Sequence, residues 1–241
     1  MPVVPYKNRD LSKKQQVALM FDKISGKYDL LNHLLSAGID ISWRKKAIRL
    51  LKPAKPKLIL DIATGTGDFA LEALRLDPDF VTGIDISEGM LEKGNEKIRK
   101  KKLENKVELK YGDSENLEFL DNKFDAVIVA FGVRNFENLE LGLSEMFRVL
   151  KNGGKVVILE FSKPSRFPYQ QIYNFYFKYI LPIVGSTISK DQSAYTYLPE
   201  SVQAFPQGDE MLEILSDIGF KNNKCIPLTF GISSIYWGEK E

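Results

Sequence analysis

The chain has little of the two residues on which many metal and disulfide sites depend. Its 241 residues include one cysteine, Cys225, and one histidine, His33. An intrachain disulfide needs two cysteines, and zinc sites use clusters of cysteine and histidine, so the sequence excludes the first and predicts no metal site. A single cysteine is typical of proteins in a reducing compartment, so we expect a cytoplasmic location.

An excess of one charge and long apolar runs are also lacking. With 34 basic and 32 acidic residues the formal net charge is +2, so nucleic acid is not expected as a partner. No stretch approaches the roughly 20 apolar residues of a membrane span, and residues 1–10 do not read as a secretory signal. The apolar fraction of 44% suffices for one large α/β core, and we expect a single domain over residues 1–241.

The stretch Leu58–Gly67 is the one around which the rest of the chain is organised. It begins with an apolar run that predicts a buried strand, and this strand carries Asp61 near its end. Gly65 and Gly67 let the backbone lie close to a ligand, and the helix expected after them offers free N–H groups at its N-terminus. The spacing Gly65-x-Gly67-x-x-Ala70 also fits the dinucleotide fingerprint, so the glycines alone do not choose a cofactor.

Asp61 favours one cofactor over the other. A carboxylate at the end of the strand can hold an ammonium group, which S-adenosylmethionine (SAM) carries and NAD does not. An NAD-dependent reductase remains the alternative, although the chain has no evident Tyr-x-x-x-Lys motif for hydride transfer. A tight turn that binds no ligand is the alternative without a cofactor.

The rest of the chain alternates between strands and helices. Further strands are predicted at 80–85, 107–111 (where apolar and polar residues alternate), 124–130 and 155–161, and two short antiparallel strands near 225–228 and 233–237. Helices are expected between them, so the fold class is a doubly wound, mostly parallel, Rossmann-like sheet of seven strands. Ligands of such sheets bind beyond the carboxyl ends of the strands. Asp85 lies at one such end, 20 residues after Gly65, the distance at which a carboxylate binds ribose.

Two segments depart from this alternation. The sequence of residues 1–52 predicts helices, the first with a capping box at Ser12–Gln15. We expect this segment to form a lid over the cofactor site. Residues 164–206 hold ten phenylalanines and tyrosines. These rings either wall an apolar substrate pocket or pack a helical cap, and the sequence leaves both interpretations open.

Three further stretches of the sequence form a recognisable set: Tyr28–Asn32 with Ser36 and Trp43, Phe131–Asn135, and Arg148–Gly154 with Leu159–Ser162. Together they resemble the class I SAM-dependent methyltransferases, and more narrowly the quinone-biosynthesis C-methyltransferases. Enzymes of that family methylate demethylmenaquinol and, in relatives, the ubiquinone precursor. The resemblance runs from about Phe21 to the C-terminus. The sequence departs from the family pattern at Asp40, where histidine is frequent, and at Asn152, where proline is usual.

The resemblance implies SAM as the cofactor and assigns its contacts. They fall on Thr66 in the glycine loop, Asp85 on the ribose, Asp113 and Ser114 near the adenine, and Ala130. The complete predicted cofactor site comprises Asp61, Gly65, Thr66, Gly67, Asp85, Ile86, Asp113, Ser114 and Ala130.

The resemblance also implies a prenylated quinol as substrate, with Tyr28, Arg134 and Asn135 on the catalytic side. Methylation of a ring carbon needs electron density from an adjacent phenolate, and the enzyme mainly aligns the reacting groups. Arg134 is always protonated and therefore a poor base. We predict that Arg134 and Asn135 orient a water that takes the phenol proton, that Arg134 stabilises the oxyanion, and that Tyr28 positions the ring.

Alternatives remain for several of these roles. The alternative to a catalytic role for Arg134 is a surface ion pair that serves only the structure. His33 is expected to be structural or to line the lid. The prenyl tail implies transient contact with the inner face of a membrane, without a span. A non-catalytic SAM-binding protein, a homodimer, and the choice between naphthoquinol and benzoquinol all stay open.

Overall fold

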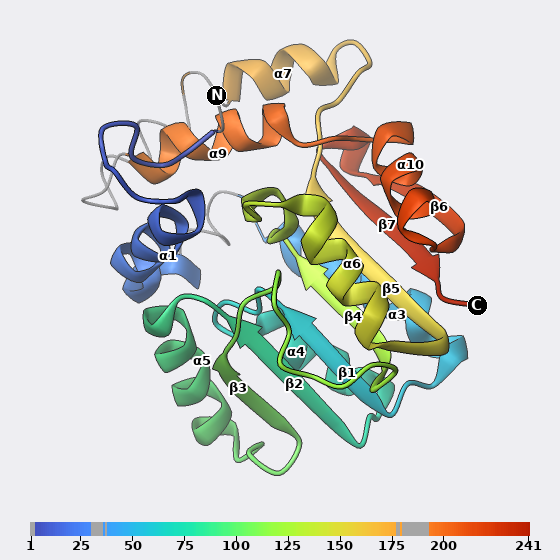
Figure 1. Ribbon diagram of the computed structural model, residues 1–241. Helices are drawn as coiled ribbons and strands as arrows, with labels where there is room; N and C mark the ends of the chain where they lie inside the picture. Colours follow the sequence, from blue (N-terminus) through green and yellow to red (C-terminus); the bar gives the residue numbers. More distant parts are fainter. Residues whose placement is uncertain (1–2, 30–35, 37, 177–178, 180–192) are drawn as a thin grey trace.

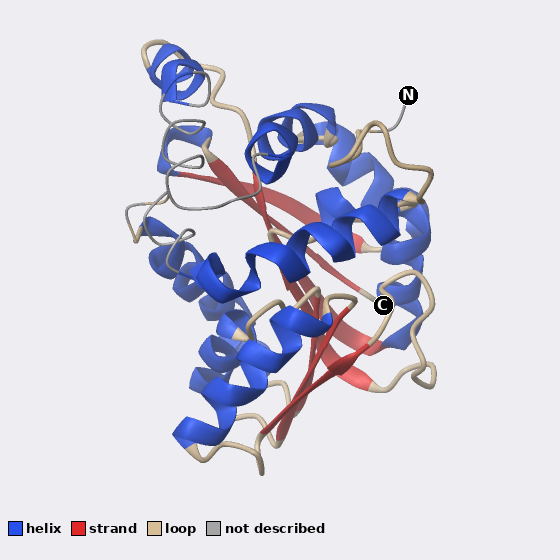
Figure 2. Cartoon of the chain, turned by 90° about the vertical axis from the view of Figure 1, so that its left-hand side faces the viewer, coloured by secondary structure: helices blue, strands red, loops and turns tan. Residues whose placement is uncertain are grey.

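A seven-stranded sheet runs through the centre of the protein, with helices on both of its faces (Figures 1 and 2). The computed structural model describes residues 3–29, 36, 38–176, 179 and 193–241. The strands lie in the order β3-β2-β1-β4-β5-β7-β6. They are β1 (Leu58–Ile62), β2 (Phe80–Asp85), β3 (Val107–Tyr111), β4 (Phe124–Ala130), β5 (Leu150–Phe161), β6 (Lys221–Leu228) and β7 (Ser233–Glu239).

The pairing confirms the predicted fold class. Strands β1 to β5 are parallel, and β7 runs antiparallel to both β5 and β6. One boundary was wrong: the strand predicted at 155–161 begins at Leu150. Gly153 and Gly154 lie inside β5, where the register against β4 shifts, and Gly153 adopts a positive φ of 79°. The two glycines therefore form an irregularity within the strand, not a turn before it.

Helices and short 3-10 turns connect the strands. The α-helices are α1 (Lys13–Ile24), α3 (Ile39–Leu51), α4 (Asp68–Ala73), α5 (Glu88–Lys101), α6 (Leu139–Val149), α7 (Tyr169–Phe175), α9 (Ser193–Ala204) and α10 (Asp209–Ile218). The 3-10 turns are η1 (Ser25–Lys27), η2 (Lys52–Ala54), η3 (Leu74–Leu76), η4 (Val133–Asn135) and η6 (Thr229–Gly231). Ser12 caps α1 through the predicted capping box with Gln15, and Ser87 caps α5.

Two apolar cores cover the two faces of the sheet. On one face, Ile59 of β1 packs in a cluster with residues of α3, α4 and α5; on the other, Leu60 and Ile62 pack with residues of α6 and α10. Successive side chains of a strand point to opposite faces, so the continuous apolar run of β1 supplies both cores. The sheet is thereby held rigid between two layers, and only the ends of its strands remain available for a site.

A third cluster joins the N-terminal helix to the aromatic segment 164–206. Val17 and Met20 of α1 pack with Tyr195 and Tyr197 of α9 and with Met90 of α5. Figure 1 shows α1 and α9 side by side, beyond the carboxyl ends of the parallel strands. In the described part of the chain, no helix combines the length and apolarity needed to cross a bilayer.

Candidate active site

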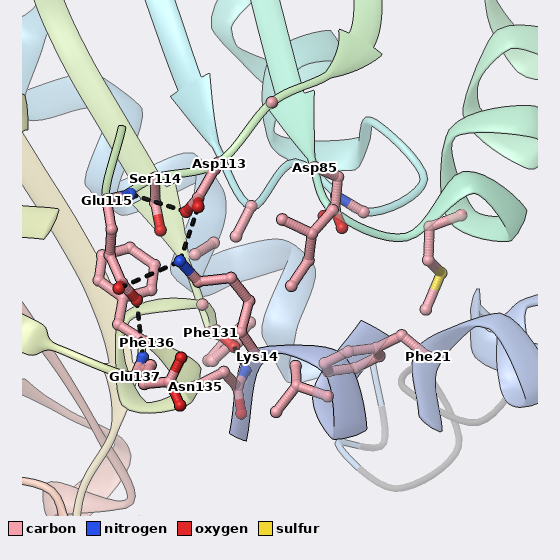
Figure 3. A pocket seen from close by; sticks show the side chains of 18 of the residues that line it. Lys14, Phe21, Asp85, Asp113, Ser114, Glu115, Phe131, Asn135, Phe136 and Glu137 are labelled. Atoms are coloured by element: carbon pink, nitrogen blue, oxygen red, sulfur yellow. Dashed lines mark hydrogen bonds and ion pairs between the residues drawn. The ribbon is translucent and has the colours of Figure 1, made fainter. Parts of the chain in front are cut away.

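Three connected cavities lie at the carboxyl ends of the central strands. The first, here the acidic cleft, is lined by Asp85, Asp113 and Glu115 among others (Figure 3). The second, the inner niche, is lined by Asp61, Thr66 and neighbouring polar residues. The third, the aromatic cavity, encloses about 340 Å³ and lies under α7 and α9. Tyr28 and Phe131 line all three, so these two rings mark the junction.

The glycine loop between β1 and α4 has the conformation that its sequence requires. Gly65 and Gly67 have φ angles of 57° and 81°, in the left-handed region that side chains disfavour. The Gly67 N–H donates to the Thr64 carbonyl over 2.9 Å and closes the turn. Gly65 lines the cleft and the niche, whereas Gly67 lines none of the three cavities and serves the turn.

Asp61 is a fully buried carboxylate with one unused oxygen. Its Oδ2 accepts a hydrogen bond from Thr64 Oγ1 at 2.5 Å, while Oδ1 has no hydrogen-bond partner among the described residues. Burial raises the pKa of Asp61 to about 7, against the opposing effect of the Thr64 hydrogen bond. A buried acceptor without a donor is costly, and a cationic donor entering the niche relieves that cost. The site therefore fits an ammonium group.

Asp85, at the end of β2, is held by the backbone. Its Oδ2 accepts the Gly65 N–H at 2.8 Å and its Oδ1 the Ser87 N–H at 2.9 Å. Burial raises the pKa of Asp85 to about 6, although these backbone hydrogen bonds lower it. Each carboxylate oxygen keeps a further lone pair, so the fixed group can still accept hydroxyl donors. Ile86 lines the cleft beside it.

Lys14 crosses the acidic cleft. Figure 3 shows its ammonium between two acids: Nζ lies 2.6 Å from Asp113 Oδ2 and 3.2 Å from Glu115 Oε2. Ser114 lines the same cleft. The sequence indicated Lys14 only as part of a helix start, because its acidic partners lie about a hundred residues away. The lid predicted over the site thus contacts one of the predicted cofactor residues directly.

Thr66 and Ala130 lie nearer the inner niche. Thr66 Oγ1 donates to Asp29 Oδ1 at 2.6 Å and accepts from Lys97 Nζ at 2.8 Å, so its hydroxyl is already engaged. Ala130, the last residue of β4, lines both the niche and the cleft. All the predicted cofactor residues except Gly67 therefore line the cleft or the niche.

Aromatic side chains dominate the third cavity. Five come from residues 164–206, and the other rings come from the N-terminal segment and the sheet: Tyr169, Tyr173, Tyr176, Tyr195 and Tyr197, with Phe21, Tyr28, Trp43, Phe131 and Phe161. This placement favours the substrate-pocket interpretation of the aromatic segment. Tyr195 and Tyr197 also belong to the cluster under α9, so the two interpretations hold together.

Arg134 lies in the wall of the aromatic cavity in a buried ion pair, not on the surface. Its Nη1 donates to Glu160 Oε1 at 2.8 Å and to the Phe131 carbonyl. The side chains of Arg134 and Glu160 are 8% and 0% exposed. Burial raises the pKa of Glu160, while the nearby Arg134 lowers it. Glu160 was not among the residues predicted from the sequence, although it lies next to the end of a buried strand, as Asp61 does.

Asn135 does not share a cavity with Arg134. It lines the acidic cleft, whereas Arg134 lines the aromatic cavity, and both donate to the carbonyl of Phe131. The Asn135 Oδ1 is buried and has no hydrogen-bond partner in the described structure. Tyr28, the third predicted catalytic residue, packs edge-to-face on Phe21 with centroids 5.9 Å apart. His33 lies outside the described residues.

Solved structures share this fold. A SAM-dependent methyltransferase from Thermotoga maritima superposes with a TM-score of 0.64 at 20% identity, covering 92% of this chain and 99% of that one. Phosphoethanolamine N-methyltransferase 2 of Haemonchus contortus, in complex with S-adenosylhomocysteine, gives a TM-score of 0.57 at 18% identity, over 76% of this chain and 48% of that one. Similarity at this level shows the methyltransferase fold alone.

Sequence relatives are much closer. Demethylmenaquinone methyltransferase of Bacteroides fragilis is 52% identical over 239 residues, covering 99% of this chain and 97% of that protein. The enzyme of the same name from Porphyromonas gingivalis is 45% identical over 99% of this chain and 98% of its own. A ubiquinone/menaquinone biosynthesis C-methyltransferase of Geotalea daltonii is 45% identical over 95% and 97%. The family model described as the ubiE/COQ5 methyltransferase family matches residues 9–240. The chain belongs to this family, which confirms the resemblance found in the sequence.

Proposed function

We propose that this protein methylates a ring carbon of a prenylated quinol with SAM, converting demethylmenaquinol to menaquinol. The observation that carries the proposal is the junction at Tyr28 and Phe131, where a polar niche with an unpaired carboxylate oxygen meets an apolar, aromatic cavity. Two of the relatives named above are demethylmenaquinone methyltransferases, which favours the naphthoquinol over the ubiquinone precursor. Membership of a methyltransferase family sets aside the NAD-dependent reductase.

The inner niche and the acidic cleft provide the groups that SAM needs. When bound, SAM supplies an activated methyl group on a sulfonium. Asp61 Oδ1 is available to accept from its ammonium, and Asp85 is fixed by two backbone N–H groups so that it can accept the ribose hydroxyls. Asp113 and Ser114 lie farther along the cleft, on the side assigned to the adenine.

The aromatic cavity provides the acceptor side. Its apolar walls exclude water and suit a fused ring, and Arg134 presents a guanidinium there that Glu160 holds in place. A fixed cation next to the ring oxygen stabilises the phenolate from which the nucleophilic carbon draws its electron density. Tyr28, at the junction, would hold the ring against the cofactor methyl. Asn135 acts from the cofactor side, because its side chain lines the cleft.

The outer surface of α7 suits the prenyl tail and a membrane surface. Phe167, Phe175 and Phe230 are 79%, 58% and 63% exposed, and Phe230 stacks on Tyr169, which lines the aromatic cavity. Exposed patches of large apolar side chains are typical of binding surfaces. We infer that α7 touches the headgroup region while the tail leaves the cavity beside it.

Product identification by mass tests the function. The purified protein receives methyl-labelled SAM with demethylmenaquinol in one reaction and the benzoquinol precursor in another, both kept reduced. We expect labelled menaquinol from the first reaction, at a higher rate than any product of the second. Binding of S-adenosylhomocysteine without a labelled product from either quinol would identify a non-catalytic SAM-binding protein and overturn the proposal.

A further inference from the structure

The inner niche holds one cation among its acids. Its described lining residues include the carboxylates of Asp61 and Asp68, while Arg44 is the one basic side chain among them. SAM ends in an α-amino acid group, so its ammonium and its carboxylate are bonded to the same carbon. Binding of the ammonium at Asp61 therefore brings a carboxylate into the same niche. A carboxylate taken out of water needs hydrogen-bond donors, and no residue discussed so far supplies them.

Arg44 projects from α3 and is fixed in the wall of the niche. The residue is 7% exposed, and its Nη1 donates to Asp40 Oδ2, four residues earlier on the helix, at 2.6 Å. The guanidinium carbon lies 5.9 Å from the ring centroid of Phe131, one of the two rings at the junction. An ion pair and a ring contact thus orient the guanidinium before any ligand binds, and such preorganisation favours binding.

Part of this guanidinium is available to a ligand. Nη1 makes the side-chain hydrogen bond to Asp40, whereas Nε and Nη2 of Arg44 make none in the described structure. Neither atom is fully buried, so a ligand can reach both. A guanidinium has five N–H donors, and two of them on one edge match the two oxygens of a carboxylate. Arg44 can therefore keep its contact with Asp40 and bind a second carboxylate.

The charges around Arg44 suit a ligand group that carries both signs. Burial raises the pKa of Asp61 and Arg44 is among the groups that lower it, so these two side chains lie close enough to interact. The other nearby acid is Asp68, whose Oδ2 lies 3.9 Å from Arg44 Nη1 and whose charge Lys97 compensates from 2.7 Å. An ammonium at Asp61 and a carboxylate at Arg44 add no net charge to the niche.

We propose that Arg44 binds the α-carboxylate of SAM through Nε and Nη2, while Asp61 binds the ammonium. This rests on the cofactor site of the proposed function and deepens it. Two contacts at one carbon fix the orientation of the amino acid group, whereas a single contact leaves it free to turn. Methyl transfer needs the donor in line with the acceptor, so a fixed amino acid group also restricts where the sulfonium can lie.

The experiment removes each partner of the contact in turn. Calorimetry measures the Kd of S-adenosylhomocysteine and of its decarboxylated analogue, which keeps the ammonium but has no carboxylate. Both ligands are titrated into the unsubstituted protein, into Arg44→Met, and into Arg44→Lys, which keeps the charge but not the planar pair of donors. Arg49→Met, at an exposed arginine of the same helix, is the matched control.

The expected result is a loss that is confined to one ligand. The unsubstituted protein binds S-adenosylhomocysteine roughly ten- to a hundredfold more tightly than the analogue, as for hydrogen bonds between charged groups. In Arg44→Met the Kd of S-adenosylhomocysteine rises by this factor, while that of the analogue changes by less than about threefold. The unchanged Kd of the analogue also shows that the variant is folded. Arg44→Lys keeps part of the preference, and Arg49→Met keeps all of it.

Other outcomes overturn the assignment. Equal Kd values of the two ligands for the unsubstituted protein would mean that the site does not recognise the carboxylate. Equal weakening of both ligands in Arg44→Met would make Arg44 a residue that only shapes the niche. If Arg44→Met does not fold, Arg44→Lys decides, because a full preference there would rule out the paired donors. These titrations contain no quinol, so a failure of the proposed quinol methylation is a separate result, seen in the product assay.

Discussion

Buried carboxylates at strand ends organise the site at the scale of single residues. Asp85 is the last residue of β2, Asp61 and Glu160 are the next-to-last residues of β1 and β5, and burial raises the pKa of each. Glu160 has Arg134 as its counter-charge and Asp85 has backbone N–H groups. Asp61 has one oxygen without a donor. A buried carboxylate oxygen without a donor is stabilised when a cationic ligand binds to it, so Asp61 favours such a ligand.

Cofactor affinity should therefore depend on the protonation of Asp61. With a pKa of about 7 in the unliganded protein, Asp61 becomes protonated as the pH falls through neutrality, and an ammonium then competes with that proton. We expect the Kd for SAM to rise by up to about tenfold per pH unit below about pH 7. In Asp61→Asn this dependence disappears, and binding at about pH 8 weakens by roughly ten- to a hundredfold, as for a lost hydrogen bond between charged groups.

Calorimetry over this pH range measures both effects. Asp77→Asn, which makes the same change at an exposed site after η3, is the matched control and should leave the Kd unchanged. The raised pKa of Asp61 also affects folding. Because of it, the folded, unliganded protein binds more protons at this carboxyl group than the unfolded chain does. Its unfolding free energy should fall as the pH rises from about 4 to about 7. A pH-independent Kd would show that Asp61 does not contact the cofactor.

Substitutions in the buried Arg134–Glu160 pair can distinguish its effect on stability from its effect on catalysis. Arg134→Met leaves the Glu160 carboxylate, which is 0% exposed, without its counter-charge. We expect a loss of about 3 kcal/mol in unfolding free energy and at least about a 100-fold loss of kcat. The double variant Arg134→Met/Glu160→Gln should recover most of the stability and none of the turnover, by denaturant titration and methyl-transfer assay. Recovery of turnover in the double variant would show that Arg134 acts only structurally.

Single residues could be predicted where the signal is local. Asp61, Asp85 and the glycines follow directly from a strand, a turn and a helix read in order, and the structure places them together. Lys14 and Glu160 could not be selected in this way, because they depend on partners 99 and 26 residues away in the chain.

At the scale of elements, α1 ties the two halves of the site together. Lys13 Nζ donates to the carbonyls of Arg134 and Phe136, at 3.1 and 2.6 Å, while Lys14 reaches Asp113. At the other end of α1, Asp22 Oδ1 accepts from Ser87 Oγ at 2.6 Å and from the Gly89 N–H at 3.0 Å. The helix thus bridges the start of α5 and the turn that carries Arg134.

Weakening this bridge should loosen α1 without unfolding the sheet. Asp22→Asn replaces a charged acceptor by a neutral one at the start of α5, for a local cost of about 1 kcal/mol. Hydrogen exchange should become faster in α1, while β1 and β4, in the centre of the sheet, keep their protection. Asp77→Asn is again the matched control. Unchanged exchange in α1 would mean that the Asp22 contacts are not needed to hold the helix.

The exposed rings of α7 and of the turn before it give the membrane proposal a direct test. Phe167→Ser, before α7, and Phe175→Ser, at its end, each remove an exposed ring, so each should weaken binding to lipid vesicles by about tenfold or more. Leu120→Ser is the control, because Leu120 is 81% exposed but precedes β4, at the opposite end of the strands from the site. Co-sedimentation measures the bound fraction. Equal binding by all three variants and the unsubstituted protein would exclude α7 as the contact surface.

Elements were predicted best where one pattern decides them. β2, β3 and β4 match the predicted bounds, because the buried apolar runs of β2 and β4 and the alternating pattern of β3 each lie between turn residues and leave little choice. The start of β5 was missed because a glycine pair usually indicates a turn, whereas here β4 continues to pair across it. The aromatic segment has no clear period, so the sequence could not tell a cavity wall from a cap. Much of it, residues 177–178 and 180–192, lies outside the described structure.

At the scale of the whole molecule, the sheet carries the three cavities of the candidate site together at the carboxyl ends of its parallel strands. Two apolar cores fix the strands, while the N-terminal helices and the segment after β5 cover the strand ends and enclose the aromatic cavity. Methyl transfer needs donor and acceptor in line. The inner niche and the aromatic cavity share Tyr28 and Phe131 in their walls, so a donor in one and an acceptor in the other would lie next to each other.

The central claim is that the cofactor and the quinol meet at this junction. A crystal structure with S-adenosylhomocysteine and a short-tailed demethylmenaquinol tests it most directly. We predict the cofactor ammonium on Asp61 Oδ1, its sulfur facing the junction, and the quinol ring in the aromatic cavity beside Tyr28 and Arg134. A cofactor bound elsewhere, or a quinol ring outside the aromatic cavity, would contradict the account.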